Sequence, residues 1–184
     1  MKEAKEYLEK LLNDGDTVVI GLSGGPDSMC LLDLLQKQRK KIKIICAHIN
    51  HNIREESKDE LIFVSNYCKK NNLKIETTVF AKEENSNELK LREKRYAYFE
   101  KIVKKYNAKY LFTAHHGDDL IETILMRITR GSNLKGYIGF TINSKKNNCT
   151  VIKPLIYTTK KEIKEYLEKN NIPYVLDRTN DEDE

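Results

Sequence analysis

Residue types suited to phosphate chemistry occur together in the segment Ser23-Gly24-Gly25-Pro26-Asp27-Ser28. The segment follows an apolar run at 17–22 and precedes a helical pattern at 29–38. Glycines let the backbone approach an anion closely, and the free N–H groups at a helix start attract negative charge. The hydroxyls of Ser23 and Ser28 add donors. The segment therefore predicts a phosphate-binding loop; the alternative left open is a glycine-rich turn that only joins a strand to a helix.

Two common phosphate motifs are absent from this loop. No Gly-Lys-Ser/Thr closes it, which excludes the phosphate loop of kinases and GTPases. The motif G-x-G-x-x-G is also missing, so a dinucleotide-binding fold is not indicated. Asp27 lies where a carboxylate can hold a magnesium ion on bound phosphates. We therefore expect Asp27 to be a Mg²⁺ ligand.

A second set of candidate residues follows the apolar run at 42–49. His48, Asn50, His51 and Arg54 are residue types that contact bases or ribose. Ordinary loop capping is the alternative for each of them, because Asn and His are common in turns. Their position at the carboxyl end of a predicted strand favours a binding role.

A third cluster contains two histidines and three carboxylates. His115 and His116 are adjacent, so their side chains diverge and a zinc site is not favoured. The dipole of the predicted helix explains one of Asp118 and Asp119, which lie in its first turn. It does not explain Glu122, which shares a helix face with Asp119. The pair Asp119 and Glu122 therefore favours a cation site, for a substrate ammonium or Mg²⁺, over capping alone.

The charged helix predicted at 85–106 carries two arginines of interest. Arg92 is four residues before Tyr96, and Arg95 is four residues before Phe99. For Arg92 and Lys94 we expect an ordinary solvated face with aromatic rings packed beneath it. An arginine such as Arg95 close to polyphosphate would stabilise charge on a transferring group.

Strand and helix patterns alternate along the chain, which predicts an α/β fold with a parallel twisted sheet of about five strands and helices on both faces. Right-handed crossovers then bring the segments 23–28, 48–54 and 114–122 to one edge of the sheet. Residues 143–149 are expected to form a polar loop or the tip of a hairpin, and residues 131–139 a glycine-containing connection. The strands are expected at 17–22, 42–49, 73–80, 109–114 and 151–156, and the helices at 3–12, 29–38, 55–71, 85–106, 118–129 and 159–170.

Composition predicts a single domain over residues 1–184 and a cytosolic location. No stretch approaches the roughly 18 apolar residues of a membrane span, and the charged N-terminus does not resemble a signal peptide. A net charge of +5 fits a nucleic-acid partner without requiring one. Scattered cysteines without a C-x-x-C pair predict reduced thiols; they are Cys30, Cys46, Cys68 and Cys149.

Taken together, these motifs resemble a known family. The loop at 23–28 resembles that of the PP-loop ATP pyrophosphatases, which include GMP synthetases and tRNA thiolases. Four further motifs look like those of the tRNA(Ile)-lysidine synthetases. With them, the resemblance extends over residues 14–180. They are His48-Ile-Asn-His51-x-x-Arg54, Arg92-x-x-Arg95-Tyr96, the run Ala114–Gly131, and Val151–Ile156 followed by a helix and Asp177-Arg-Thr-Asn180.

The resemblance implies an enzyme that uses ATP and Mg²⁺ to adenylate the wobble cytidine of an isoleucine tRNA. The amine of free L-lysine then attacks carbon 2 and expels AMP. It implies lysine recognition by Asp119 and Glu122, and catalytic roles for Asp27, Arg95, His115 and Asp119. ATP contacts are expected from Ser23, Gly24, Gly25, Asp27, Ser28, His48 and Asn50.

The chain departs from the family pattern after Asn180, where it ends in Asp-Glu-Asp-Glu instead of a basic stretch. This predicts a catalytic domain without the C-terminal tRNA-binding domains. The sequence leaves open whether the protein forms a homodimer. Two other interpretations stay open as well: a PP-loop tRNA thiolase, which would need a catalytic cysteine pair or an iron–sulfur cluster, and a nucleotide-binding module without catalysis.

Overall fold

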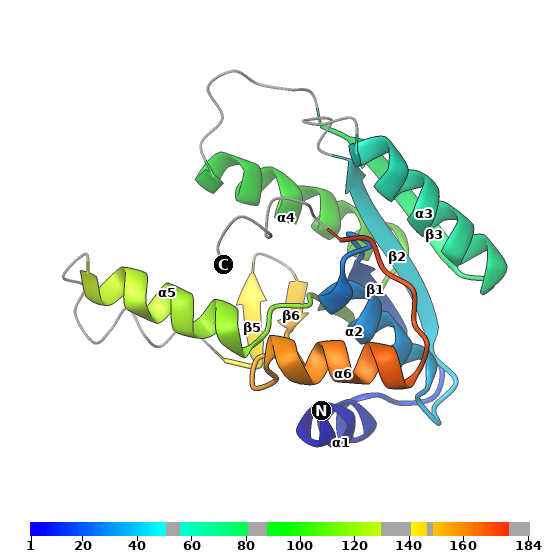
Figure 1. Ribbon diagram of the computed structural model, residues 1–184. Helices are drawn as coiled ribbons and strands as arrows, with labels where there is room; N and C mark the ends of the chain where they lie inside the picture. Colours follow the sequence, from blue (N-terminus) through cyan, green and yellow to red (C-terminus); the bar gives the residue numbers. More distant parts are fainter. Residues whose placement is uncertain (51–55, 81–87, 130–140, 147–148, 177–184) are drawn as a thin grey trace.

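One six-stranded sheet organises the molecule, with the strand order β3-β2-β1-β4-β6-β5 (Figure 1). The computed structural model describes residues 1–50, 56–80, 88–129, 141–146 and 149–176. The strands are β1 (Thr17–Gly21), β2 (Lys43–Asn50), β3 (Lys74–Val79), β4 (Tyr110–Phe112), β5 (Asn143–Lys146) and β6 (Cys149–Ile152). The helices are α1 (Lys2–Leu11), α2 (Pro26–Gln36), α3 (Glu56–Lys70), α4 (Glu88–Lys105), α5 (Gly117–Thr129) and α6 (Lys160–Lys169).

The predicted α/β fold is confirmed, with one addition at the sheet edge. Strands β1 to β4 and β6 are parallel, whereas β5 pairs with β6 in the antiparallel sense. Of the two expectations for residues 143–149, the hairpin is confirmed, whereas a polar loop was wrong because residues 143–146 form a strand. Strand β6 begins and ends earlier than the strand expected at 151–156. Strand β5 has the sequence Asn-Ser-Lys-Lys, which has no apolar alternation to predict a strand. Such a sequence suits an edge strand, because its polar side chains can face solvent.

Helices cover both faces of the sheet. On one face α1, α2, α3 and α6 pack around a buried core that includes Leu31, Ile20 and Phe112. On the other face α4 packs against β1, β2 and β4 through a smaller core that includes Phe99 and Val19. Helix α5 extends away from the sheet on the β5 side (Figure 1). Within the described ranges, no helix combines the length and apolar composition that a membrane crossing requires.

Local signals set the helix starts next to the strand ends. Helix α2 begins directly after Gly25, with Pro26 in its first turn, and Met29 to Leu35 are all buried, so it passes through the core. Helix α6 begins with a capping box between Thr159 and Glu162. Tyr166 of α6 donates a 2.7 Å hydrogen bond to Asp33 of α2, which ties the two helices together.

Gly21, the last residue of β1, lies against the ring of Phe99. A Cβ atom at Gly21 would approach Phe99 Cζ to 2.9 Å, which is too close for carbon atoms. Helix α4 can pack this near to β1 only because position 21 has no side chain. The same helix carries Arg92 and Arg95, so this contact also sets their distance from the ends of the strands.

We expect Gly21→Ala to lower the free energy of unfolding by about 1–3 kcal/mol, because the added methyl group overpacks this interface. Urea denaturation measures the change. In a double-mutant cycle with Phe99→Leu, the smaller side chain should recover part of the loss. Additive effects of the two substitutions would contradict the proposed contact.

Candidate active site

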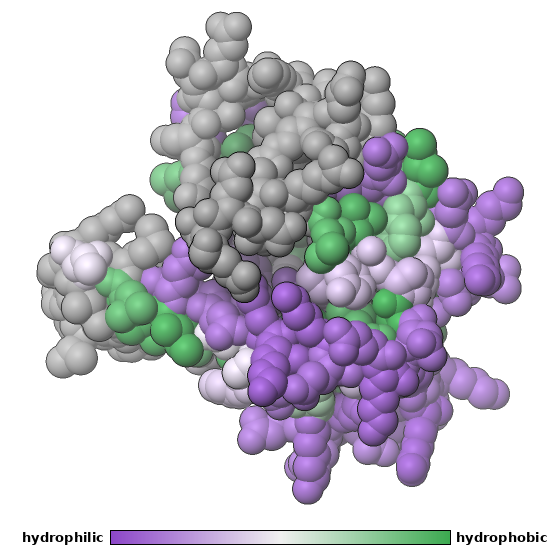
Figure 2. All heavy atoms as spheres, viewed as in Figure 1, coloured by the Kyte–Doolittle hydropathy of each residue, from purple (hydrophilic) through white to green (hydrophobic). Residues whose placement is uncertain are grey.

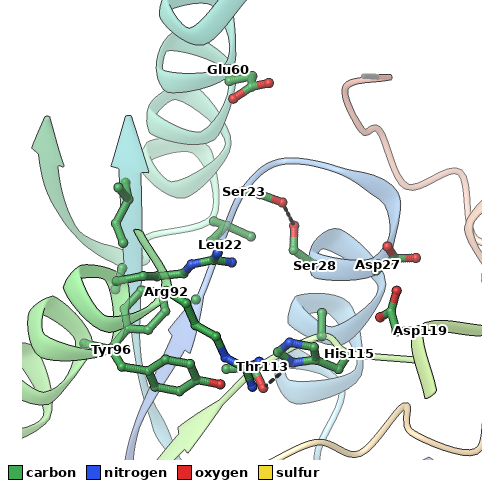
Figure 3. A pocket seen from close by; sticks show the side chains of 16 residues that line it. Leu22, Ser23, Asp27, Ser28, Glu60, Arg92, Tyr96, Thr113, His115 and Asp119 are labelled. Carbon is green, nitrogen blue, oxygen red and sulfur yellow. Dashed lines mark hydrogen bonds between the residues drawn. The ribbon is translucent and has the colours of Figure 1, made fainter. Parts of the chain in front are cut away.

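A cavity of about 380 Å³ opens at the carboxyl edge of the sheet (Figure 3). Its wall is formed by the ends of β1, β2 and β4, the loop before α2, helix α4 and the start of α5. The predicted convergence of the segments after β1 and β4 is therefore confirmed. Six of the predicted site residues line it: Ser23, Asp27, Ser28, Arg95, His115 and Asp119. Arg92 lines it as well, although the sequence predicted only a solvated position over an aromatic ring; its guanidinium does lie over Tyr96.

The loop between β1 and α2 is held in shape by its own hydroxyl groups. Ser28 Oγ accepts a 3.1 Å hydrogen bond from Gly24 N and donates a 3.0 Å bond to Gly25 O. Gly25 N donates to Ser23 Oγ at 3.3 Å, and the two serine hydroxyls lie 3.1 Å apart. Gly24 has a φ of +98°, which favours glycine. The hydroxyls that were predicted to bind phosphate therefore form hydrogen bonds within the loop and hold its shape.

His116 joins the loop to the start of α5, and sequence reasoning missed it. Its side chain is buried, and its Nε2 atom lies 3.5 Å from both Asp27 Oδ2 and Asp119 Oδ1. Burial alone would lower its pKa, but the two carboxylates outweigh burial and raise it. The available sequence signal was its position three residues before Asp119, typical of a helix cap.

The adjacent residues Asp118 and Asp119 have different structural roles. Asp118 Oδ2 accepts a 2.6 Å hydrogen bond from the backbone N of Lys160, so it links α5 to the start of α6. Asp119 Oδ2 accepts a 3.0 Å bond from His116 N, which caps its own helix. Its other oxygen, Oδ1, is the one that faces the His116 ring. Capping therefore occupies part of each carboxylate.

A second cavity of about 320 Å³ lies next to the first, and Asp119 lines both. Glu122 lines only this second cavity, on the α5 face that it shares with Asp119. The cavity is bordered by Lys160 and by Ile121 and Leu125, which are 57% and 56% exposed and belong to the apolar strip on α5 visible in Figure 2. Asp119 is the residue through which the two cavities meet.

The other side of the first cavity is cationic. Arg92 and Arg95 reach it from α4, and the Arg95 Nε atom is buried without a hydrogen-bond partner among the described residues. His115 is half-buried beside them, and its Nδ1 atom lies 3.0 Å from Thr113 Oγ1. Burial, together with Lys153 and both arginines, lowers the pKa of His115 to about 4, so its imidazole is neutral at pH 7.

His48 and Asn50 are not among the residues that line the cavity. Both are buried in β2, and side chains alternate between the faces of a strand, so Ala47 and Ile49 reach the cavity instead. His48 Nδ1 donates a 2.8 Å hydrogen bond to Leu22 O, which supports the loop from the other face of the sheet. Burial lowers the pKa of His48. The predicted residues at 51–54, 131–139 and 177–180 lie outside the described residues.

All 184 residues match the model of the PP-loop domain family. The chain belongs to this family. Proteins called tRNA(Ile)-lysidine synthase resemble it further: one from Bacillus cereus is 40% identical over 179 residues, which cover 92% of this chain and 38% of the relative. One from Bacillus subtilis is 38% identical over 194 aligned positions, which cover 100% of this chain and 41% of the relative. The PP-loop chain thus spans about two fifths of the length of these relatives.

Solved structures agree with the PP-loop fold. A U34-tRNA thiolase from Methanococcus maripaludis, with its 4Fe-4S cluster, has a TM-score of 0.79 at 21% identity, over 95% of this chain and 64% of that chain. An NH3-dependent NAD synthetase from Campylobacter jejuni has a TM-score of 0.58 at 17% identity, over 92% of this chain and 69% of that chain. At such identities the likeness concerns the fold alone.

The low pKa of His115 makes a testable contribution to stability. Because its folded-state pKa is about 4 and its ordinary value is 6.5, the unfolded chain binds more protons between these pH values. Stability should therefore fall as the pH decreases from about 6.5 towards about 4, and this contribution should be absent in His115→Gln. Urea denaturation across this pH range, with NMR titration of the histidine ring, measures both quantities. A His115 ring that titrates near pH 6.5 would contradict this electrostatic account.

Proposed function

We propose that this chain is the adenylating domain of a tRNA(Ile)-lysidine synthase. The names of its relatives support this function, and the observation that carries it is the position of Asp119. This carboxylate lines both the cavity at the phosphate loop and the adjoining cavity that contains Glu122. A nucleotide in the first cavity and an amine in the second would therefore meet at Asp119.

The proposed reaction has two steps. The oxygen on carbon 2 of the wobble cytidine attacks the α-phosphorus of ATP, and pyrophosphate leaves. The deprotonated ε-amine of L-lysine then attacks carbon 2, and AMP leaves with the oxygen. Adenylation is needed because a carbonyl oxygen is a poor leaving group until it carries a phosphoryl group.

The residues of the larger cavity suit the first step. The loop at 23–28 offers backbone N–H groups at the start of α2 to the phosphates of ATP. Arg95, whose buried Nε atom has no hydrogen-bond partner among the described residues, would stabilise charge on the phosphoryl group in transfer. His115 remains neutral, so it adds no positive charge and keeps one ring nitrogen as an acceptor for a polar hydrogen.

Asp27 suits a magnesium ion, because Mg²⁺ prefers carboxylate and phosphate oxygens. Its side chain is 31% exposed and lines the larger cavity. Among the described residues, no group of three or more His, Cys, Asp or Glu side chains forms a metal site, so Asp27 would share the ion with the phosphates of ATP. When bound, the ion would neutralise charge on the departing pyrophosphate.

The thiolase alternative requires reactive sulfur at the site. Every one of the four cysteines is buried, and none is among the residues lining the larger cavity. Burial, with Asp33 and Asp27 nearby, raises the pKa of Cys30 to about 12, so its thiolate is scarce at pH 7. The cysteine positions therefore favour the lysine-using enzyme, whereas the thiolase likeness rests on the fold.

A nucleotide-binding module without catalysis would have no use for the second cavity. Such a module needs the phosphate loop but not the Asp119 and Glu122 pair. Lysine incorporation into an isoleucine tRNA, measured with radiolabelled lysine and ATP, decides between the module and the enzyme. Cytosolic location and a homodimer stay predictions.

We expect Asp119→Asn and Glu122→Gln each to weaken lysine binding about tenfold or more, because a charge-assisted hydrogen bond to the ammonium is lost. Equilibrium dialysis with radiolabelled lysine in the presence of an ATP analogue measures the affinity. Glu165→Gln is the matched control, since it removes an exposed carboxylate of α6 outside both cavities. Unchanged lysine affinity in both site variants would rule out the ammonium site.

A further inference from the structure

Two lysines at the β5 edge of the sheet form a feature that the proposed reaction does not use. We call Lys146 of β5 and Lys153, directly after β6, the edge cation pair. In the antiparallel register Lys146 lies opposite Cys149, on the face covered by α4. Lys153 follows Ile152 on the same face as Val151, beside Thr113, which lines the larger cavity.

Lys153 is an unusual lysine because only 9% of its surface is exposed. Burial lowers its pKa, and the neighbouring cations Arg92 and Lys146 lower it further. Within the part of the chain that the structure describes, no carboxylate forms a salt bridge with Lys153. A buried ammonium among like charges destabilises the fold, so its presence here points to a function.

Lys146 joins the same group of charges through an aromatic ring. Its Nζ atom lies 3.6 Å from the centroid of the Tyr96 ring, and Arg92 Cζ lies 6.0 Å from that centroid. Burial lowers the pKa of Lys146, Arg92 and Arg95 lower it further, and Glu93 opposes them. Tyr96 thus holds Lys146 beside the arginines by cation–π attraction.

The place of the edge cation pair indicates which anion it serves. Neither lysine is among the residues that line the larger cavity, whereas Arg92, Arg95 and the phosphate loop are. A nucleotide bound by that loop would leave the pair outside its site. A base inserted into the cavity from a polymer would instead leave its flanking phosphates beyond the cavity wall. The net charge of +5 agrees with a polyanionic partner.

We infer that Lys146 and Lys153 bind a backbone phosphate of the RNA next to the nucleotide that enters the cavity. The inference rests on the proposed function. Arg92, which lines the cavity and adjoins both lysines, connects the nucleotide site to this RNA site. The like-charge repulsion in the free protein is relieved when the phosphate binds, so the site is prepared for an anion before the RNA arrives.

The test compares the wild-type chain with Lys146→Ala, Lys153→Met and the control Lys145→Ala. Lys145 is exposed and alternates to the other face of β5, so its variant loses the same charge without touching the pair. Fluorescence anisotropy with a labelled anticodon stem-loop RNA, over a series of KCl concentrations, measures RNA affinity. Binding of a non-hydrolysable ATP analogue is measured in parallel.

We expect each pair variant to weaken RNA binding about tenfold and to reduce the salt slope by about 0.7, as for one lost phosphate contact. The ATP analogue should bind each variant as it binds wild type. Lys153→Met should unfold at the same temperature as wild type or higher, because repulsion is removed; a purely structural lysine would give a lower temperature. RNA binding equal to that of Lys145→Ala, or a loss confined to the ATP analogue, would overturn the inference.

Failure of the proposed function has a different signature. In that case the wild-type protein incorporates no lysine into isoleucine tRNA, whatever the pair variants do to RNA affinity. If lysine is incorporated and the pair variants still bind RNA like wild type, only the phosphate site is lost. A wild-type chain that binds no RNA overturns the phosphate site as well.

Discussion

The parallel alignment of β1 and β4 is the constraint on which the site depends. Because these strands are neighbours, the loop after β1 and the segment after β4 leave the sheet side by side. His116 then reaches 3.5 Å from both Asp27 and Asp119, residues that are separated in sequence by half the length of the chain. Each carboxylate belongs to the first turn of a helix, where the helix dipole favours it. Sheet topology and helix starts together place two acids around one buried imidazole.

The site is divided by charge, and the two adjacent histidines lie on opposite sides of the division. His116 faces carboxylates from α2 and α5, so its pKa is raised in spite of burial. For His115, burial lowers the pKa, and Lys153 with the arginines of α4 lowers it further. One peptide bond thus separates an imidazole whose pKa is raised from one whose pKa is lowered to about 4. This separation arises because successive side chains leave the carboxyl end of β4 in different directions.

The fold and part of the lining of the larger cavity could be predicted from the sequence, because buried parallel strands and glycine-rich turns have strong local patterns. Strand β5 could not, since an edge strand of polar residues has no apolar periodicity. His48 and Asn50 were assigned to the site by their position near a strand end. Their side chains point to the other face, and a shift of one residue reverses the face in a strand. His116 was missed because its partners Asp27 and Asp119 meet it only in the folded chain.

The close packing of α4 against β1 explains why the arginines of this helix reach the site. Gly21 allows this helix to approach β1 closely, so side chains on its inner surface reach the ends of the strands. Arg92 and Arg95 are three residues apart on one helix face, which brings both to the cavity. Positive side chains that lie close together in low-dielectric surroundings repel one another. This repulsion lowers the stability of the fold until an anion binds. Phosphate is an anion whose geometry suits guanidinium and ammonium groups together, so under the proposed function the cations on the α4 side of the sheet would contact phosphate groups, opposite the acids of α2 and α5.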